Sequence, residues 1–140
     1  MRALSIRQPW AWLIINGLKT LETRGWTTEY RGPLLIHASK GMTRDEYASA
    51  RGFAADNGVQ IPPVDALVRG GIVGECELTG WVYESTDPWF CGPYALRLER
   101  AREVPFVPWR GALGFFDVPR DALTLNVVLR GARSEGGEAS

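Results

Sequence analysis

Hydrophobic and polar positions follow two different periods along the chain, one typical of strands and one typical of helices. The period of two is clearest from Tyr94 to Glu99, where apolar and polar side chains alternate as in a half-buried strand. Short apolar runs between turn residues predict the other strands. The expected strands cover residues 3–6, 34–38, 72–82, 94–99, 104–108 and 113–118.

Two segments carry the signals of helices. Pro9 is suited to the first turn of a helix, because its missing N–H needs no partner there, and Gly17 follows the helix as a stop. Thr43 and Glu46 form a capping box, which predicts a second helix over residues 44–56. Strands with two helices predict an α+β fold, a small mixed β-barrel with flanking helices.

Residues 18–24 also alternate, which is consistent with a strand. In a strand, Glu22 and Arg24 share one face, whereas Lys19 and Leu21 lie on the opposite face. Glycines interrupt the later strand over residues 72–82 and indicate bulges or a close approach of the backbone to another group.

Length and composition fit one globular domain. The chain has 140 residues and a mass of 15.5 kDa, with 45% hydrophobic and 23% charged residues. We expect the domain to cover residues 1–119. Residues 120–140 form a C-terminal extension whose Gly-, Ser- and Glu-rich end is expected to be partly disordered.

No apolar run is long enough for a membrane span, and Arg7 and Gln8 interrupt the N-terminus before any signal-peptide core. Two cysteines are too few for a disulfide scaffold, and a single histidine argues against a His-rich metal site. We therefore expect a cytoplasmic protein with free thiols, no membrane partner, no metal and no cofactor.

Charge is unevenly distributed although the net charge is zero. Residues 1–44 contain seven basic and two acidic side chains, whereas residues 45–140 contain nine basic and fourteen acidic ones. A basic half that is rich in arginine suits recognition of phosphates or bases. Chance imbalance on solvated faces, or a coding bias toward arginine, would give the same counts.

Three segments carry the most specific pattern. They are Leu4-Ser5-Ile6-Arg7-Gln8-Pro9-Trp10-Ala11, Gly17-x-Lys19-x-x-Glu22-x-Arg24 and Arg31-Gly32-Pro33-Leu34-Leu35-Ile36-His37-Ala38-Ser39. With these motifs, residues 3 to about 118 resemble the activating signal cointegrator homology (ASCH) family of the PUA-like superfamily.

The resemblance implies a PUA-like barrel with a cleft between barrel and helices. It also implies binding of RNA, DNA, single-stranded nucleic acid or a modified nucleoside. Some relatives hydrolyse N4-acetylcytidine to cytidine and acetate, and their catalytic lysine corresponds to Lys19. Glu22 stands where the minimal bacterial enzyme has threonine, and in this the chain resembles eukaryotic-type ASCH domains.

The candidate catalytic residues are Lys19, Glu22 and Glu75. A lysine in a cleft can act as a base, a nucleophile or an oxyanion partner, and a carboxylate can move the proton to the leaving amine. Glu22 with Arg24 is equally consistent with a structural ion pair. Glu75, which shares a strand face with Glu77, is also consistent with a solvated surface.

The candidate substrate-binding residues offer stacking rings, charge or hydrogen bonds. Trp10 and Trp26 flank the polar cluster, where either can stack on a base or lie in the core. His37 is consistent with a buried core histidine or with a cleft residue. Trp89, Phe90 and Tyr94 form an aromatic wall or close the end of the barrel. The candidate binding set is Gln8, Trp10, Arg24, Trp26, His37, Ser39 and Lys40.

Three functions remain open from the sequence. The first is a nucleic-acid or modified-nucleoside binding domain that hydrolyses N4-acetylcytidine. The second is a non-catalytic reader of RNA or DNA that uses the same residues. The third is a ribonuclease, which needs acid and base groups near a 2′-OH.

Overall fold

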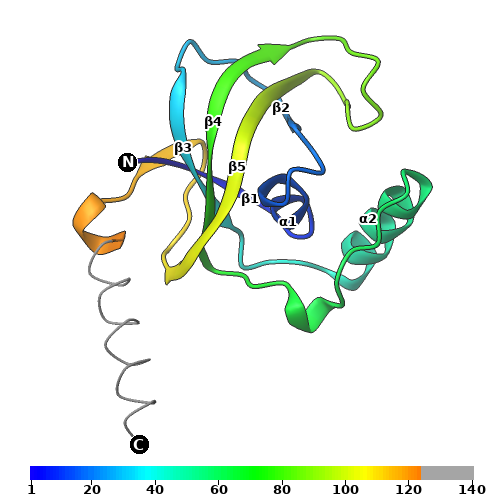
Figure 1. Cartoon of the computed structure of the whole chain (residues 1–140), viewed down its shortest axis with the longest axis horizontal. Coiled ribbons are helices and arrows are strands. Elements are labelled where there is room, and N and C mark those ends of the chain that lie inside the picture. The colour runs from blue at the N-terminus through cyan, green and yellow to red at the C-terminus, as the bar shows by residue number, and fades with distance from the viewer. Residues whose placement is uncertain (124–140) are drawn as a thin grey trace, which may run out of the picture.

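A computed structural model describes residues 1–123 (Figure 1). The strands and helices follow the order of the predicted elements, with one short 3-10 helix that the sequence did not predict. The elements are β1 (Arg2–Ile6), α1 (Trp10–Ile15), β2 (Leu21–Arg24), β3 (Gly32–Ala38), α2 (Arg44–Asp56), η1 (Val64–Ala66), β4 (Gly71–Val82), β5 (Tyr94–Pro108) and β6 (Phe115–Asp117). Residues 120–123 are also helical. The expected disordered tail lies outside the described residues.

The six strands form one mixed sheet in the order β2-β5-β4-β3-β1-β6. The β1–β3 pair is parallel, and the other pairs are antiparallel. The sheet curls into a half-barrel whose end strands are β2 and β6 (Figure 1). The predicted α+β class and barrel-like sheet are therefore confirmed.

Helix α1 packs against the sheet through the buried residues Ala11, Ile14 and Ile15. Gly74 on β4 makes this contact possible, because a Cβ atom there would lie 2.4 Å from Ile15 Cγ2. The sequence predicted a bulge or a close approach at Gly74. Register shifts in the β4–β5 pair lie on both sides of Gly74. The group that lies close to its backbone is the Ile15 side chain of α1.

Strand β5 is one strand of 15 residues, whereas the sequence predicted two separate strands within it. The polar residues between the two apolar stretches look like a loop in the sequence. They are exposed instead, and Arg100 takes a positive φ of 53°. The strand continues through this irregularity because β4 pairs with β5 residues both before and after Arg100.

Helix α2 begins and ends as predicted. The Thr43 side chain accepts a hydrogen bond from the Glu46 backbone N–H at 3.1 Å, so the capping box forms. Ala54 packs with Leu13 of α1 and Ile61 in a small separate cluster. The helix therefore stands beside the sheet and leaves space between them (Figure 1).

Within residues 1–123, no helix has the length and apolar character needed to cross a membrane.

Candidate functional site

A cleft of about 1640 Å³ opens between the sheet, α2, the loop of residues 83–93 and the segment of residues 109–114. Seven of the ten candidate residues line it. They are Trp10, Lys19, Glu22, Arg24, His37, Ser39 and Lys40. All seven come from residues 1–44, the basic part of the chain.

Lys19 and Glu22 form a buried ion pair on the cleft wall. Their residues are only 5% and 8% exposed, and Lys19 Nζ lies 3.2 Å from Glu22 Oε1. The Lys19 ammonium also donates to the backbone oxygen of Leu21. The predicted placement of Lys19 on the opposite face was wrong, because β2 begins only at Leu21 and Lys19 precedes the strand.

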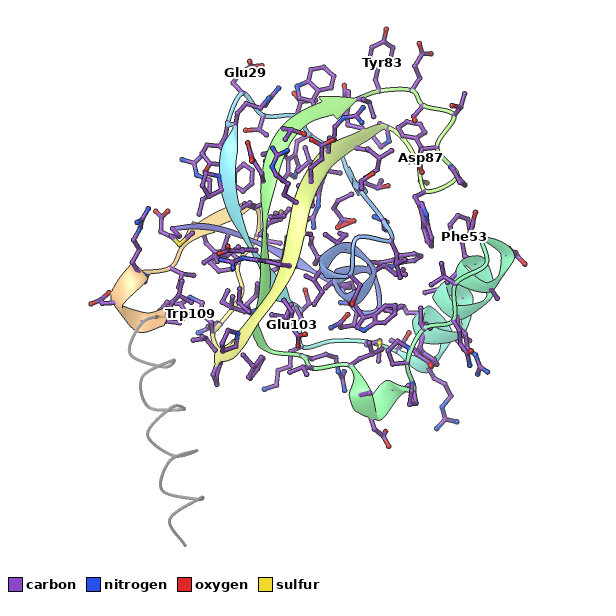
Figure 2. The ribbon with its side chains drawn as sticks, viewed as in Figure 1. Glu29, Phe53, Tyr83, Asp87, Glu103 and Trp109 are labelled. Atoms are coloured by element: carbon purple, nitrogen blue, oxygen red, sulfur yellow. The ribbon has the colours of Figure 1, made fainter. Side chains whose placement is uncertain are left out.

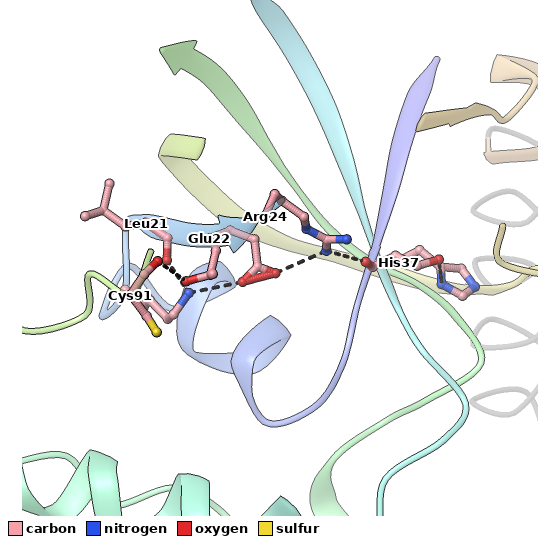
Figure 3. Close-up of polar contacts among 8 residues, drawn as sticks. Leu21, Glu22, Arg24, His37 and Cys91 are labelled. Carbon is pink, nitrogen blue, oxygen red and sulfur yellow. Dashed lines mark hydrogen bonds and ion pairs between the residues drawn. The ribbon is translucent and has the colours of Figure 1, made fainter. Parts of the chain in front are cut away.

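Arg24 extends this pair into a polar chain (Figure 3). One terminal nitrogen, Nη2, lies 3.2 Å from Glu22 Oε2 and donates to the Ser5 backbone oxygen at 2.7 Å. Glu22 and Arg24 share a strand face, as the alternation predicted. The Arg24 Nε is buried and has no hydrogen-bond partner among residues 1–123.

A second group of polar contacts continues from Ser5. Its hydroxyl lies 3.0 Å from His37 Nδ1, and His37 Nε2 lies 2.7 Å from the backbone oxygen of Trp109. His37 is 2% exposed, yet it also lines the cleft. Both sequence interpretations of His37 therefore describe part of its position.

Three aromatic rings form a second part of the cleft lining, which we call the ring group: Trp10, Phe53 and Trp89. Their centroids lie 5.3–6.5 Å apart, and every pair meets edge to face. The rings come from α1, α2 and the 83–93 loop, so they join three separate segments. Figure 2 shows Phe53 on α2 and Asp87 on the neighbouring loop. Phe53 is 41% exposed and offers a face to a ligand.

Basic side chains lie at the edge of the cleft. Lys40, Arg69 and Arg110 are exposed and line it, and an Arg69 guanidinium nitrogen donates to the Lys40 backbone oxygen at 2.9 Å. Arg7 also lines the cleft and pairs with Glu46 at 2.7 Å. This pairing holds the pKa of Glu46 below its ordinary value, chiefly through the hydrogen bond from Arg7.

Three candidate residues lie outside the cleft. The Gln8 amide accepts from the Trp12 backbone N–H at 2.9 Å and donates to Val68 O at 2.8 Å, so it secures the first turn of α1. Trp26 packs edge to face on Phe115 at 5.2 Å. Glu75 is paired with Arg102 on the β4–β5 surface.

Sequence reasoning missed several residues of the cleft. Ser5, Phe53 and Trp109 line it. Ser5 lies within a motif but was not chosen as a candidate, whereas Phe53 and Trp109 lie outside all three motifs. Phe53 is the one with a signal, since it is a large apolar residue in a helix of low apolar content. Of the expected aromatic wall, Trp89 and Phe90 line the cleft, whereas Tyr94 packs on Trp81.

Both cysteines are free thiols, as predicted. Cys76 is buried, and burial raises the pKa of its thiol to about 12, with a smaller contribution from the charge of Glu75. Cys91 is exposed at the cleft, where its backbone oxygen accepts a hydrogen bond from Thr23 Oγ1 at 2.9 Å. Within residues 1–123, no three His, Cys, Asp or Glu side chains are grouped as metal ligands.

The comparison with protein families decides the identity of the fold. The ASCH domain model matches residues 4–118. The chain belongs to the ASCH domain family. All seven cleft-lining candidate residues fall inside the matched range, and so does the segment of residues 109–114.

Two kinds of relatives are similar to this ASCH domain. Activating signal cointegrator 1 of Homo sapiens and of Mus musculus are each 50% identical over 36 residues. That match covers 26% of this chain and only 6% of either cointegrator. The chain therefore spans a small part of the length of these relatives.

Solved structures support the fold. The crystal structure of ASCH from Zymomonas mobilis superposes with a TM-score of 0.54 at 14% identity, over 91% of this chain and 94% of that one. A tyrosine mutant of the same protein gives a TM-score of 0.54 at 13% identity, over 91% and 96%. At this level of identity, the likeness shows a common fold only.

Proposed function

We propose that the cleft binds one nucleoside unit, either free or within single-stranded RNA. The observation that carries the proposal is the Lys19–Glu22–Arg24 chain, in which Lys19 and Glu22 are buried and which opens into the same cleft as the ring group. A base has a polar edge and a flat apolar face. The ion chain suits the edge, and the rings suit the face.

The polar chain has hydrogen-bonding capacity left for a ligand. Leu21 O and Glu22 take two of the three hydrogens of the Lys19 ammonium, which leaves one for an incoming acceptor. Arg24 uses Nη2 for both of its contacts, so its second terminal nitrogen is available for a pyrimidine carbonyl or a phosphate. Exposed Lys40, Arg69 and Arg110 suit the phosphates of flanking nucleotides.

A second candidate function is hydrolysis of N4-acetylcytidine. The specific observation in its favour is the 3.2 Å contact between the Lys19 ammonium and the Glu22 carboxylate in a buried part of the cleft. A charged lysine can stabilise an oxyanion there, and the carboxylate can accept a proton from water.

The reaction balances with these two groups. Water adds to the acetyl carbonyl as Glu22 takes its proton, and Lys19 stabilises the tetrahedral oxyanion. The bond between the carbonyl carbon and N4 then breaks, and Glu22 returns the proton to the leaving amine. The products are cytidine and acetic acid, which loses its proton to water and leaves as acetate.

The first experiment measures binding and turnover in parallel. Purified protein is titrated with N4-acetylcytidine and with a short single-stranded RNA, and acetate release is followed separately. We expect binding to weaken as salt rises for the RNA but little for the nucleoside.

Lys19→Ala tests the chemistry, with Glu77→Gln on the exposed β4–β5 surface as the matched control. Loss of one oxyanion partner lowers turnover by roughly 100-fold or more. Binding without acetate release supports a non-catalytic reader of RNA or DNA and excludes the hydrolase function. If the protein binds neither N4-acetylcytidine nor the RNA, the nucleoside-binding proposal is overturned.

A further inference from the structure

Ser5 and His37 lie opposite each other in the parallel pair of β1 and β3. Their side chains therefore project from the same face of the sheet, where the Ser5 hydroxyl and His37 Nδ1 are 3.0 Å apart. The β3–β4 register shifts between Ile36 and His37, and such an irregularity re-aims a side chain. His37 thereby reaches the Trp109 backbone oxygen across the cleft lining.

The partners of the imidazole determine its tautomer. A carbonyl oxygen only accepts, so His37 Nε2 carries the hydrogen that it donates to Trp109 O at 2.7 Å. In the neutral ring, Nδ1 is then the acceptor, and the Ser5 hydroxyl donates to it. Each ring nitrogen has one partner, one on the sheet and one on the segment of residues 109–114.

The segment of residues 109–114, which we call the end wall, connects β5 to β6 and lines the cleft. It lies close to the imidazole because position 111 has no side chain. A Cβ atom at Gly111 would lie 2.5 Å from Ser5 Oγ and 2.8 Å from His37 Cε1. Leu113 is 99% exposed, so this part of the end wall makes little contact with the core.

We propose that His37 is a positioning residue, which holds the end wall in place through Trp109 and so keeps the cleft ready for its ligand. The nature of the ligand depends on the proposed nucleoside-binding function, whereas the role of His37 in holding the end wall does not. Gly111 lies against the Ser5 hydroxyl, and this close cover favours a positioning role for the Ser5–His37 pair over a nucleophilic one.

The opposing interpretation is a core histidine without influence on the cleft. His37 packs edge to face on Phe116 at 5.6 Å, and this contact would be its main role in that case. The two interpretations differ in what happens to the end wall when only the polar contacts of the ring are lost.

The experiment uses the full chain and begins without any ligand. His37 is the one histidine in the sequence, so its two ring nitrogens give unambiguous 15N signals. We expect the Nε2–H tautomer. Backbone 15N relaxation at Gly111 and Ala112 should match that of β6 in the wild type. It should show faster motion in His37→Leu and stay as in the wild type in His37→Gln, which retains a donor for Trp109 O.

Binding of N4-acetylcytidine is then measured for the same proteins. We expect affinity to fall about tenfold in His37→Leu and to stay within about threefold in His37→Gln. Gly111→Ala keeps the histidine but forces the end wall and the imidazole apart, and its affinity should also fall about tenfold. Glu77→Gln, on the exposed β4–β5 surface, is the control and binds as the wild type does.

Each outcome supports or overturns the anchor, by which we mean the contact from His37 to Trp109 that holds the end wall. An ordered end wall and unchanged affinity in His37→Leu overturn it, as does the Nδ1–H tautomer. If His37→Leu fails to fold by circular dichroism, Gly111→Ala decides, and unchanged binding and relaxation there overturn the anchor. If the wild type binds no nucleoside while the relaxation results hold, the proposed function fails and the anchor stands.

Discussion

Ion pairs between a glutamate and a basic side chain occur in two places, the cleft and the exposed surface of β4 and β5. In the cleft, the Lys19 and Glu22 side chains are 6% and 10% exposed. On the surface, the Arg100 and Glu77 side chains are 63% and 45% exposed. The surface pair is also the closer one, with a nitrogen–oxygen distance of 2.6 Å against 3.2 Å.

This difference shows that distance alone does not identify a functional pair. Exposed charges keep their hydration and interact weakly, so a short contact there contributes little. Charges withdrawn from water interact strongly and have little solvent to compete with a ligand. The sequence carries both kinds as ordinary Glu and Arg or Lys residues, and only the fold separates them.

Removing the shared carboxylate should give the largest effect. Glu22→Leu leaves the buried Lys19 and the partly buried Arg24 without a counter-charge, which should lower the free energy of unfolding by ~3–5 kcal/mol. Urea unfolding followed by circular dichroism measures the loss. A change below about 1 kcal/mol would contradict the view that the pair is energetically buried.

The ring group gives the next largest effect, which is measured on binding. Trp89→Ala removes one stacking face and should weaken binding of a short single-stranded RNA by ~1–3 kcal/mol. Calorimetric titration measures it. Trp81→Ala is the matched control, because Trp81 packs on Tyr94 away from the cleft. Equal losses in both variants would remove the ring group from the binding site.

The surface pairs should give a smaller effect. We expect Glu77→Gln and Arg102→Ala each to change the free energy of unfolding by only ~0.2–1 kcal/mol, and less as salt is added. The same urea experiment at low and high salt measures both. A loss of stability as large as that of Glu22→Leu would contradict the view that the surface pairs contribute less than the cleft pair.

The smallest effect concerns Glu46, which is paired with Arg7 at the edge of the cleft. Its folded-state pKa lies below the ordinary value of 4.5, so its stabilising contribution is present above that pH and is lost as the pH falls through the folded pKa. Glu46→Gln should therefore melt slightly below the wild type at about pH 6, and the gap should be narrower at about pH 3. Thermal melts at both pH values test this, and a gap that widens in acid would contradict it.

Local signals in the sequence were sufficient for most of the fold. The capping box at Thr43 fixes the start of α2, since its hydrogen bonds involve residues only three positions apart. The two strands predicted within β5 were wrong as separate elements. Their continuity depends on pairing with β4, which is a contact between distant residues and leaves no local pattern.

The site divides in the same way. Glu22 and Arg24 could be placed together from alternation, because both lie within β2. Lys19 was placed on the wrong face, since the start of β2 depends on pairing with β5. The end wall could not be predicted, because its position depends on the contact between His37 and Trp109, which are 72 residues apart.

The order of the strands has a consequence for how β2 and β1 are joined. Strands β2 and β6 end the sheet, and Arg24 reaches from β2 to the Ser5 backbone of β1. Strands β2 and β1 are not paired, so a side chain and not a backbone ladder joins β2 to β1 beside the cleft. A shorter side chain at position 24 would therefore remove this link and leave the paired strands as they are.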